Sequence, residues 1–350
     1  MNKELIIYRL KFDAPLHISD CRADGRVSQT TIPSDTFYAA LTACLVKMGH
    51  KIDVSGDLGF RISSLFPFFQ DKDTNNGEPI YFLPMSFQTT LPKLKDVGKA
   101  KDVKKVRWVD SRLYGTILRG KSLFDGNDSM VKNIQSSFLT ETGLPTDIGG
   151  SKNFVKSHVV QRIVMEDRTG KRDVRPYFID RITFSCQSGL YFIVEPSEKK
   201  TTEALGTLEK ALNLLKVEGI GSDRNVGYGS FIYVKKNLTI DIPEKGDHQL
   251  SLSMLIPTKE QLPELLRSND VAYEFVRRGG WITTENENSL RKSAVYAFMP
   301  GSVFCVNDKC NSPGTIVNLL PKSVSNMIGH PIWRNGKAIT LPVLINDSNE

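Results

Sequence analysis

The sequence predicts an α+β fold with antiparallel sheets, and three observations lead to that prediction. Apolar residues alternate at the start of the chain, two later segments carry apolar residues at helical spacing, and short apolar runs stand between turn-rich stretches. The chain of 350 residues exceeds the size of one small core, so we expect two domains. With 40% hydrophobic and 24% charged residues, its composition is typical of a globular protein.

The start of the chain predicts a strand, a helix and two further strands. Residues 5–12 alternate between apolar and polar side chains, as in a half-buried strand. The apolar face of that strand consists of Ile6, Tyr8, Leu10 and Phe12. A helix is predicted to begin with Ser34 as its N-cap and to end at Gly49. The apolar segments 65–69 and 80–85 predict two strands.

A long stretch, about residues 89–175, shows no sustained periodicity, and we interpret it as a largely irregular insertion. Regular structure is expected again over 177–184 and 190–194, which read as strands. A helix follows, and the leucines on its apolar stripe are Leu205, Leu208, Leu212 and Leu215. After it, residues 230–234 predict a strand. Without the insertion the order is β-α-β-β-α-β, which is typical of a ferredoxin-like (RRM-like) domain.

The boundary between two domains is expected at residues 235–237. This gives an N-terminal domain over 1–236 and a C-terminal domain over 237–350. The second begins with an alternating strand over 250–256, followed by a helix capped near Thr258 and several short strands. We interpret it as a second, degenerate ferredoxin-like domain.

A glycine-rich loop, residues 219–229, stands between the predicted helix and the strand that follows it. A dinucleotide-binding loop runs from strand to helix, so the order here excludes that class, and the loop has no Gly-Lys-Ser/Thr of a P-loop. Glycine adopts positive φ freely and lets backbone amides approach phosphates. Two interpretations are open: a phosphate-binding loop, or a structural loop that packs against the sheet.

Positive charge is concentrated in two stretches of a chain whose formal net charge is +7. Residues 93–121 carry ten Lys/Arg and three Asp/Glu, and residues 152–181 carry eight and four. The second stretch is richer in arginine, whose guanidinium matches phosphate geometry better than an ammonium does. Such stretches suit a polyanionic partner, although residues 93–105 alone are more typical of a solvated loop.

Other classes of protein are disfavoured. No apolar run approaches the ~18 residues of a membrane span, and no signal-peptide pattern opens the chain. Cys305 and Cys310 lack a second pair of ligands, so the evidence for zinc is weak. We therefore expect a cytoplasmic protein that uses no metal, no cofactor and no membrane.

Several segments together resemble a known family, the RAMP superfamily of CRISPR-associated RNA-binding proteins. The segments similar to its opening strand, first helix and glycine-rich signature are 8–18, 33–41 and 219–229. Further segments resemble one subfamily, the fourth subunit of the type III-A (Csm) effector complex: 64–68, 81–84, 278–281 and 300–304. The resemblance covers most of the chain, and the order of the segments adds to its specificity.

Residues 162–172 resemble the family pattern Arg-x-x-x-x-Asp-Arg-x-Thr-Gly, which leads into a thumb hairpin that touches guide RNA. From the residues alone, this segment predicts a hairpin with a Thr-Gly turn and basic flanks, or an edge hairpin with solvated charges. The resemblance implies that RNA is bound by the hairpin, the glycine-rich loop and one N-terminal histidine. The expected RNA-binding residues are His17, Arg162, Arg168, Lys171, Arg172, Arg175, Gly219, Gly221, Ser222, Arg224, Asn225, Gly227, Tyr228 and Gly229.

The resemblance implies a non-catalytic subunit that holds the 5′ handle of the guide RNA in antiviral defence. Its implied partners are the guide (CRISPR) RNA, a large polymerase-like signalling subunit and backbone RAMP subunits. A guide-processing endoribonuclease is the alternative, with His17 as general acid or base. No tyrosine or lysine is paired with His17 by the sequence, and the chain continues well past the glycine-rich loop, so we expect no catalytic residues.

An unrelated RNA-binding protein with two RRM-like domains is the third hypothesis, but the string [KR]-G-[FY]-[GA]-[FY] is absent. Two further residues carry expectations. Asp35 is expected to stabilise the dipole of the first helix. Trp281 follows Arg277-Arg278-Gly279-Gly280, a turn that could serve RNA or a neighbouring subunit, but a lone tryptophan in a strand lies more often in a core, which is the prediction here.

Overall fold

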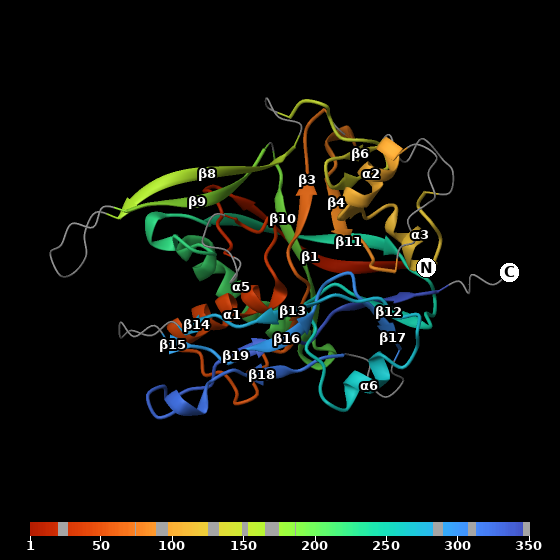
Figure 1. The fold of residues 1–350 in the computed structure, drawn as a ribbon. Helices are drawn as coiled ribbons and strands as arrows, with labels where there is room; N and C mark the ends of the chain where they lie inside the picture. Colours follow the sequence, from red (N-terminus) through yellow and green to blue (C-terminus); the bar gives the residue numbers. More distant parts are fainter. Residues whose placement is uncertain are drawn as a thin grey trace.

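The structure is a computed structural model, and Figure 1 shows its fold. It describes residues 1–19, 27–73, 75–88, 97–124, 133–148, 153–164, 175–185, 187–282, 290–306 and 313–345. Antiparallel sheets dominate, with a few helices packed against them. In this part of the chain no helix combines the length and the apolar character needed to cross a membrane.

One large sheet is built around the first strand. β1 (Asn2–Phe12) lies between β11 (Phe231–Asp241) and β10 (Gly189–Pro196) and is antiparallel to both. β3 (Phe66–Phe69) and β4 (Ile80–Pro84) continue the sheet beyond β10, so its order there is β11-β1-β10-β3-β4. β2 (Phe60–Ile62) pairs with the other end of β10.

Helices α1 (Ser34–Lys47) and α5 (Thr201–Glu218) pack side by side on one face of this sheet (Figure 1). The predicted alternation in β1 is confirmed, because the four expected residues all contribute to the core beneath these helices. The predicted leucine stripe of α5 is confirmed as well. The prediction of Ser34 as N-cap is wrong: Pro33 holds that position, and the Ser34 hydroxyl instead accepts a hydrogen bond from the Met254 amide at 2.8 Å.

The stretch expected to be irregular contains regular elements in its described part. Besides β8 (Val155–Val164), which belongs to the hairpin described next, these are α2 (Val97–Lys105), β5 (Trp108–Asp110), α3 (Tyr114–Leu118), β6 (Ile134–Gln135) and β7 (Phe138–Leu139). Strands β5, β7 and β6 extend the large sheet past β4, and β5 pairs with β7 in parallel. The prediction failed here because elements of two to nine residues are too short to show a sustained period.

A long hairpin follows, made of β8 (Val155–Val164) and β9 (Arg175–Phe184), and it projects from the body of the molecule (Figure 1). The expected Thr-Gly turn between these strands lies outside the described residues. At the base of the hairpin, Leu16 and Ile182 exchange two backbone hydrogen bonds of 2.9 and 2.8 Å. The hairpin is therefore held to the segment that leaves β1.

The second part of the chain is mostly short strands. β12 (His248–Ser251) lies between β17 (Val303–Cys305) and β20 (Thr340–Val343). The other pairs are β13 (Phe275–Arg278) with β16 (Val295–Phe298), β14 (Trp281–Ile282) with β15 (Leu290–Arg291), and β18 (Ile316–Asn318) with β19 (Trp333–Asn335). The helix expected after Thr258 is the short α6 (Gln261–Leu265), and Thr258 and Gln261 exchange two hydrogen bonds of 3.2 Å at its start.

Four short 3₁₀ turns complete the description: Asn75–Gly77, Glu198–Lys200, Arg224–Val226 and Lys322–Val324. Residues 235–237, the expected domain boundary, lie inside β11, which pairs with β1 along its whole length. A core on the second face of the large sheet contains residues of β1, α3 and β12. The two parts of the chain thus share both a strand and a core.

Candidate nucleic-acid interface

The glycine-rich loop connects α5 to β11, and its four glycines all have positive φ, between 74° and 98°. A Cβ atom at Gly219, Gly221 or Gly229 would lie within 2.4 Å of a backbone oxygen of Tyr228, His17 or Ile220, respectively. A Cβ atom at Gly227 would meet nothing within 4 Å. Packing therefore requires three of these glycines, whereas only the backbone conformation requires Gly227.

Most amides in this loop already donate a hydrogen bond, either within the loop or to other parts of the protein. The Ser222 amide donates to the His17 carbonyl at 2.9 Å, and the Gly229 amide donates to the Pro15 carbonyl at 2.9 Å. The outward part of the loop is the 3₁₀ turn Arg224–Val226, where Arg224 and Asn225 have exposed side chains. The loop therefore offers an anion its side chains at this turn, and the exposed Ser222 beside them, more than a cradle of amides.

The hairpin and the loop meet in one cluster of charged and aromatic side chains. Arg162 of β8 places Nη1 2.9 Å from Oδ2 of Asp223, and its guanidinium lies 5.2 Å from the centroid of the Tyr228 ring. The guanidinium of Arg181 on β9 lies 5.7 Å from the same centroid. The structure thus brings together two expected residues, Arg162 and Tyr228. It adds Arg181, which ends the arginine-rich stretch but was not among the expected residues.

His17 lies beneath this cluster rather than on its surface. Its side chain is 3% exposed, and Nδ1 lies 2.7 Å from the backbone oxygen of Asp180. The Asp180 carboxylate accepts hydrogen bonds from the Ser157 hydroxyl at 2.6 Å and the Ser28 amide at 2.9 Å. His17 and Asp180 therefore join the base of the hairpin to the segment on which the glycine-rich loop rests.

The remaining expected residues stand, in the sequence, between β8 and β9 or at the start of β9. Arg168, Lys171 and Arg172 lie outside the described residues. Arg175 is the first residue of β9 and is paired with Val164 in the ladder. The structure places this residue at the distal end of the described hairpin.

The lysine-rich stretch before the hairpin already has acidic partners for two of its arginines. Arg112 lies 2.5 Å from the buried carboxylate of Asp110, and hydrogen bonds to that group raise the pKa of the guanidinium. Arg119 lies 2.6 Å from Asp241 in β11. These arginines contribute to the fold, and we do not include them in the interface.

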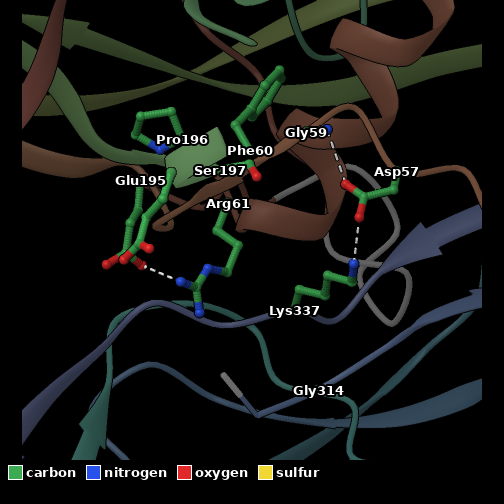
Figure 2. A pocket seen from close by; sticks show the side chains of 10 residues that line it. Asp57, Gly59, Phe60, Arg61, Glu195, Pro196, Ser197, Gly314 and Lys337 are labelled. Atoms are coloured by element: carbon green, nitrogen blue, oxygen red, sulfur yellow. Dashed lines mark hydrogen bonds and ion pairs between the residues drawn. The ribbon is translucent and has the colours of Figure 1, made fainter. Parts of the chain in front are cut away.

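A groove of about 730 Å³ lies between the two parts of the chain (Figure 2). Two ion pairs line it, Arg61 with Glu195 and Lys337 with Asp57. Because each cation there has a carboxylate beside it, the groove is a poor match for a polyanion.

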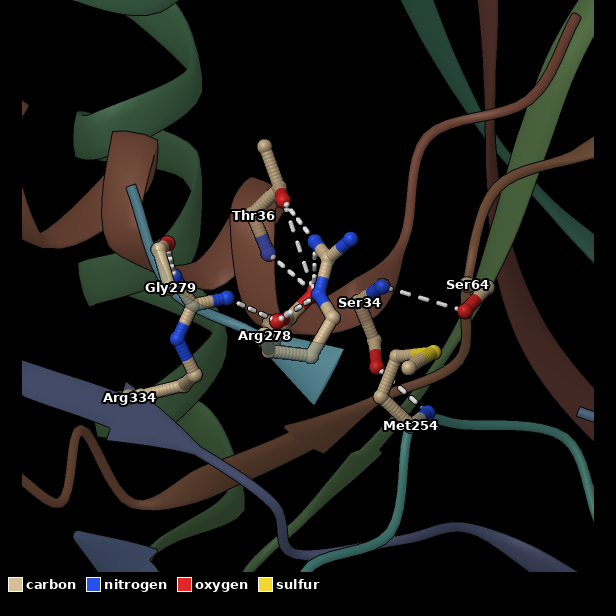
Figure 3. Close-up of polar contacts among 8 residues, drawn as sticks. Ser34, Thr36, Ser64, Met254, Arg278, Gly279 and Arg334 are labelled. Atoms are coloured by element: carbon tan, nitrogen blue, oxygen red, sulfur yellow. Dashed lines mark hydrogen bonds and ion pairs between the residues drawn. The ribbon is translucent and has the colours of Figure 1, made fainter. Parts of the chain in front are cut away.

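The first helix contributes a buried ion cluster (Figure 3). The Asp35 carboxylate accepts hydrogen bonds from Arg278 at 2.9 and 3.0 Å and is also ion-paired with Arg334. Burial alone would raise the pKa of Asp35, but the two guanidinium groups outweigh burial and lower it. The expectation of a role in the helix dipole was incomplete, because Asp35 in the first turn of α1 also holds the second part of the chain.

Two other expectations concern single residues. The prediction of a buried Trp281 is wrong: its side chain is 55% exposed, and the Arg291 guanidinium lies 4.5 Å from its ring centroid. No group of three or more metal-ligating side chains is found among the described residues. Cys310 lies outside the described residues. Cys305 is buried, with Sγ 3.8 Å from Nε2 of His248.

Comparisons with known proteins agree with this architecture. Residues 244–343 match the family described as the CRISPR Csm4 C-terminal domain. The Csm4 protein of Methanocaldococcus jannaschii is 21% identical, and the match covers 97% of each chain. The Csm4 protein of Streptococcus thermophilus is 24% identical over 79% of this chain and 82% of the relative.

Solved structures share the fold. A chain of the Csm3–Csm4 subcomplex of a type III-A CRISPR-Cas interference complex superposes with a TM-score of 0.60 at 17% identity, covering 97% of this chain and 99% of that one. A chain of a Csm1–Csm4 cassette in complex with cA4 gives a TM-score of 0.57 at 18% identity, covering 97% and 98%. Residues 244–343 thus match the Csm4 C-terminal domain, and the whole chain is similar in sequence and in fold to Csm4 proteins.

Proposed function

We propose that this protein is a non-catalytic RNA-binding subunit of a type III-A CRISPR effector complex and holds the 5′ handle of the guide RNA. The observation that carries the proposal is the cluster of Arg162, Arg181 and Tyr228, in which the hairpin and the glycine-rich loop meet. Guanidinium groups beside an aromatic ring suit a flexible polyanion, since they bind phosphates while rings stack on bases.

The proposed partners follow from the solved complexes of related proteins. Those complexes unite Csm4 with Csm3 and with Csm1. We therefore propose that this chain assembles with a backbone RAMP subunit and with the large polymerase-like subunit in antiviral defence. The second part of the chain, which matches the Csm4 C-terminal domain, supports a role in assembly.

The proposal includes two ferredoxin-like domains, over 1–236 and 237–350. For the first, the sheet order β11-β1-β10-β3 with α1 and α5 on one face supports a β-α-β-β-α-β unit. Hairpin β8–β9 would be its thumb. For the second, support is limited to the family match that starts at residue 244. Because β11 ends at Asp241, we place the effective boundary just after this shared strand.

The proposed RNA site has two sets of residues. On the hairpin they are Arg162, Arg168, Lys171, Arg172 and Arg175. On the loop they are Ser222, Arg224, Asn225, Gly227 and Tyr228, with Arg224 and Asn225 as the outward contacts. The packed glycines Gly219, Gly221 and Gly229 would give the loop its shape. His17, which is buried, would hold the loop and the hairpin in place and would not contact RNA itself.

The alternative, a guide-processing endoribonuclease, requires His17 to reach an RNA phosphate or ribose. Its burial and its contact with the Asp180 carbonyl support the non-catalytic reading. Purified protein incubated with repeat RNA, with and without Mg²⁺, should leave the RNA intact. Cleavage that disappears in His17→Ala would establish the nuclease instead.

Arg224→Ala tests the site, because Arg224 is exposed and its loss spares the backbone of the loop. We expect a folded protein whose affinity for handle RNA falls by roughly 1–3 kcal/mol, the range for a hydrogen bond to a charged group. Arg267→Ala is the matched control, because Arg267 is an exposed arginine beside α6 in the second part of the chain. Equal affinity of both variants and the wild type would remove Arg224 from the site.

A further inference from the structure

The second part of the chain carries a two-stranded ribbon that the proposed site does not use. β13 pairs with β16 as far as Arg278↔Val295, and β14 pairs with β15 from Trp281↔Arg291. Between these two pairs, the chain advances by three residues on the first strand and by four on the second. The Lys292 amide donates to the Gly280 carbonyl at 2.9 Å in this interval. The two ladders are therefore one ribbon with a bulge. We call residues 275–282 and 290–298 the aromatic ribbon.

Large aromatic side chains lie on the surface of the aromatic ribbon. Phe275, Trp281 and Tyr296 are 57%, 55% and 61% exposed. The rings of Phe275 and Tyr296 lie edge to face, with centroids 5.6 Å apart. The opposite face explains why the ribbon folds, because Val276 and Ala297 pack there against a core of the second part.

An arginine stands beside these rings at both ends of the ribbon. Arg277 is directly opposite Tyr296 in the ladder, and the Arg291 guanidinium lies 4.5 Å from the Trp281 ring centroid. The aromatic ribbon contains four Lys/Arg residues and no Asp or Glu. Arg278 is held by Asp35, so the arginines that the ribbon exposes beside its rings are Arg277 and Arg291.

The ribbon is also held firmly at the bulge. Arg278, next to Arg277, donates to Asp35 and to the Thr36 hydroxyl of α1, and Arg334 donates to the Gly279 carbonyl at 2.8 Å (Figure 3). These bonds fix the strand between the two exposed ends of the ribbon. A platform fixed in this way loses little conformational entropy when a ligand binds.

We propose that the aromatic ribbon is a second RNA contact, on which unpaired bases beyond the handle stack. This rests on the proposed function and extends it from the first part of the chain to the second. Stacking on rings with arginines beside them is the usual way to hold single strands without reading their sequence. The cluster around Tyr228 has the same chemistry, and in Figure 1 hairpin β8–β9 and the β14–β15 end of the ribbon extend toward the same side of the molecule.

Arginines beside the exposed rings favour RNA over a protein partner, since guanidinium groups bind phosphates while the rings stack on bases. Leucine substitutions separate the two, because leucine keeps apolar area but cannot stack on a base. The test compares two labelled RNAs by fluorescence anisotropy: the handle alone, and the handle extended by unpaired pyrimidines. The proteins are the wild type, Phe275→Leu/Tyr296→Leu, Arg224→Ala and the control Leu262→Ala, which alters an exposed apolar residue of α6.

We expect Phe275→Leu/Tyr296→Leu to bind the extended RNA about 5- to 100-fold more weakly, with unchanged affinity for the handle. Arg224→Ala should weaken both, and Leu262→Ala neither. If the double variant does not fold, Arg277→Gln/Arg291→Gln should lower the salt slope for the extended RNA by about two.

Wild-type binding of the extended RNA by a folded double variant would overturn the ribbon proposal and leave the handle site standing. The ribbon proposal is also overturned if the variant keeps its RNA affinity but no longer binds a neighbouring subunit. The ribbon would then be a protein interface. If the wild type binds neither RNA, the proposed function itself fails, and the ribbon proposal fails with it.

Discussion

Two clusters in this protein have the same composition, a carboxylate with two arginines nearby, yet they differ in their exposure. At Asp35 the carboxylate is fully buried, and the side chains of Arg278 and Arg334 are 13% and 10% exposed. At Asp223 the carboxylate is 19% exposed and Arg162 is 24% exposed, with Tyr228 beside it. The first cluster joins α1 to the second part of the chain, and the second joins the hairpin to the glycine-rich loop.

Burial decides what each cluster can do. A buried pair is costly to break, since removal of one partner leaves an uncompensated charge, so the Asp35 cluster fixes the two parts of the chain. A partly exposed cluster contributes less to stability and can exchange its carboxylate for a phosphate. Four substitutions test this contrast.

Asp35→Ala should have the largest effect, because it leaves two arginines buried without a partner. We expect the free energy of unfolding to fall by about 3–5 kcal/mol in urea denaturation. Asp57→Ala is the matched control: Asp57 also pairs with a residue of the second part, Lys337, but both side chains are about one third exposed. That change should cost about 1 kcal/mol or less. Equal losses in both variants would contradict the contrast.

The Asp35 cluster should also be sensitive to acid. The pKa of Asp35 is lowered in the folded protein, so its ion pairs stabilise the fold above the unfolded-state pKa of about 4. That contribution is lost as the pH falls from about 4 through the folded-state pKa. The difference in unfolding free energy between wild type and Asp35→Asn should be constant from about pH 5 to 8 and shrink in more acidic buffer. A difference that persists unchanged in acid would show that the carboxylate charge is not what matters.

Arg162→Ala should act on RNA binding rather than on stability. We expect a loss of about 1–3 kcal/mol in affinity for handle RNA and a salt slope reduced by about one, because one phosphate contact is lost. Circular dichroism and thermal melting should remain close to wild type. Unfolding without any change in salt slope would assign Arg162 to the fold.

Asp223→Asn should have the smallest effect and the opposite sign. Removal of this carboxylate frees Arg162 and takes a negative charge out of the proposed site. We expect RNA to bind a few-fold more tightly, and stability to change by less than about 1 kcal/mol. Weaker binding in a folded variant would mean that the ion pair positions Arg162 for RNA.

Sequence patterns predicted the parts of this fold that are long and periodic. The apolar face of β1 and the leucine stripe of α5 were found because each repeats over several turns or pleats. The elements between α2 and β7 were missed because each is too short to repeat. The pairing of Asp35 with Arg278 and Arg334 was also missed. The two arginines follow Asp35 by 243 and 299 positions in the sequence, so the pairing leaves no local pattern.

For the candidate site, the sequence indicated the segments but not their arrangement. The arginine-rich stretch and the glycine-rich loop were both recognised, and the contact of Arg162 with Tyr228 was not. His17 had the residue type of a catalytic group, but burial is a property of the fold and removed it from the surface. Trp281 was expected to be buried and is exposed. A lone aromatic residue in a strand does not reveal which face of the strand the rest of the protein covers.

The pairing of β1 has a consequence for the order of events during synthesis. β1 precedes both of its neighbours in the chain, because it lies between β10 and β11, whose last residue is Asp241. At about 5–20 residues per second, roughly 10–50 s pass before the second neighbour exists. Both edges of β1 are open until β10 ends at Pro196, and one edge stays open until β11 is complete. Open edges of this kind favour aggregation of a nascent chain. Chaperone binding to β1 during synthesis should therefore raise the yield of folded protein.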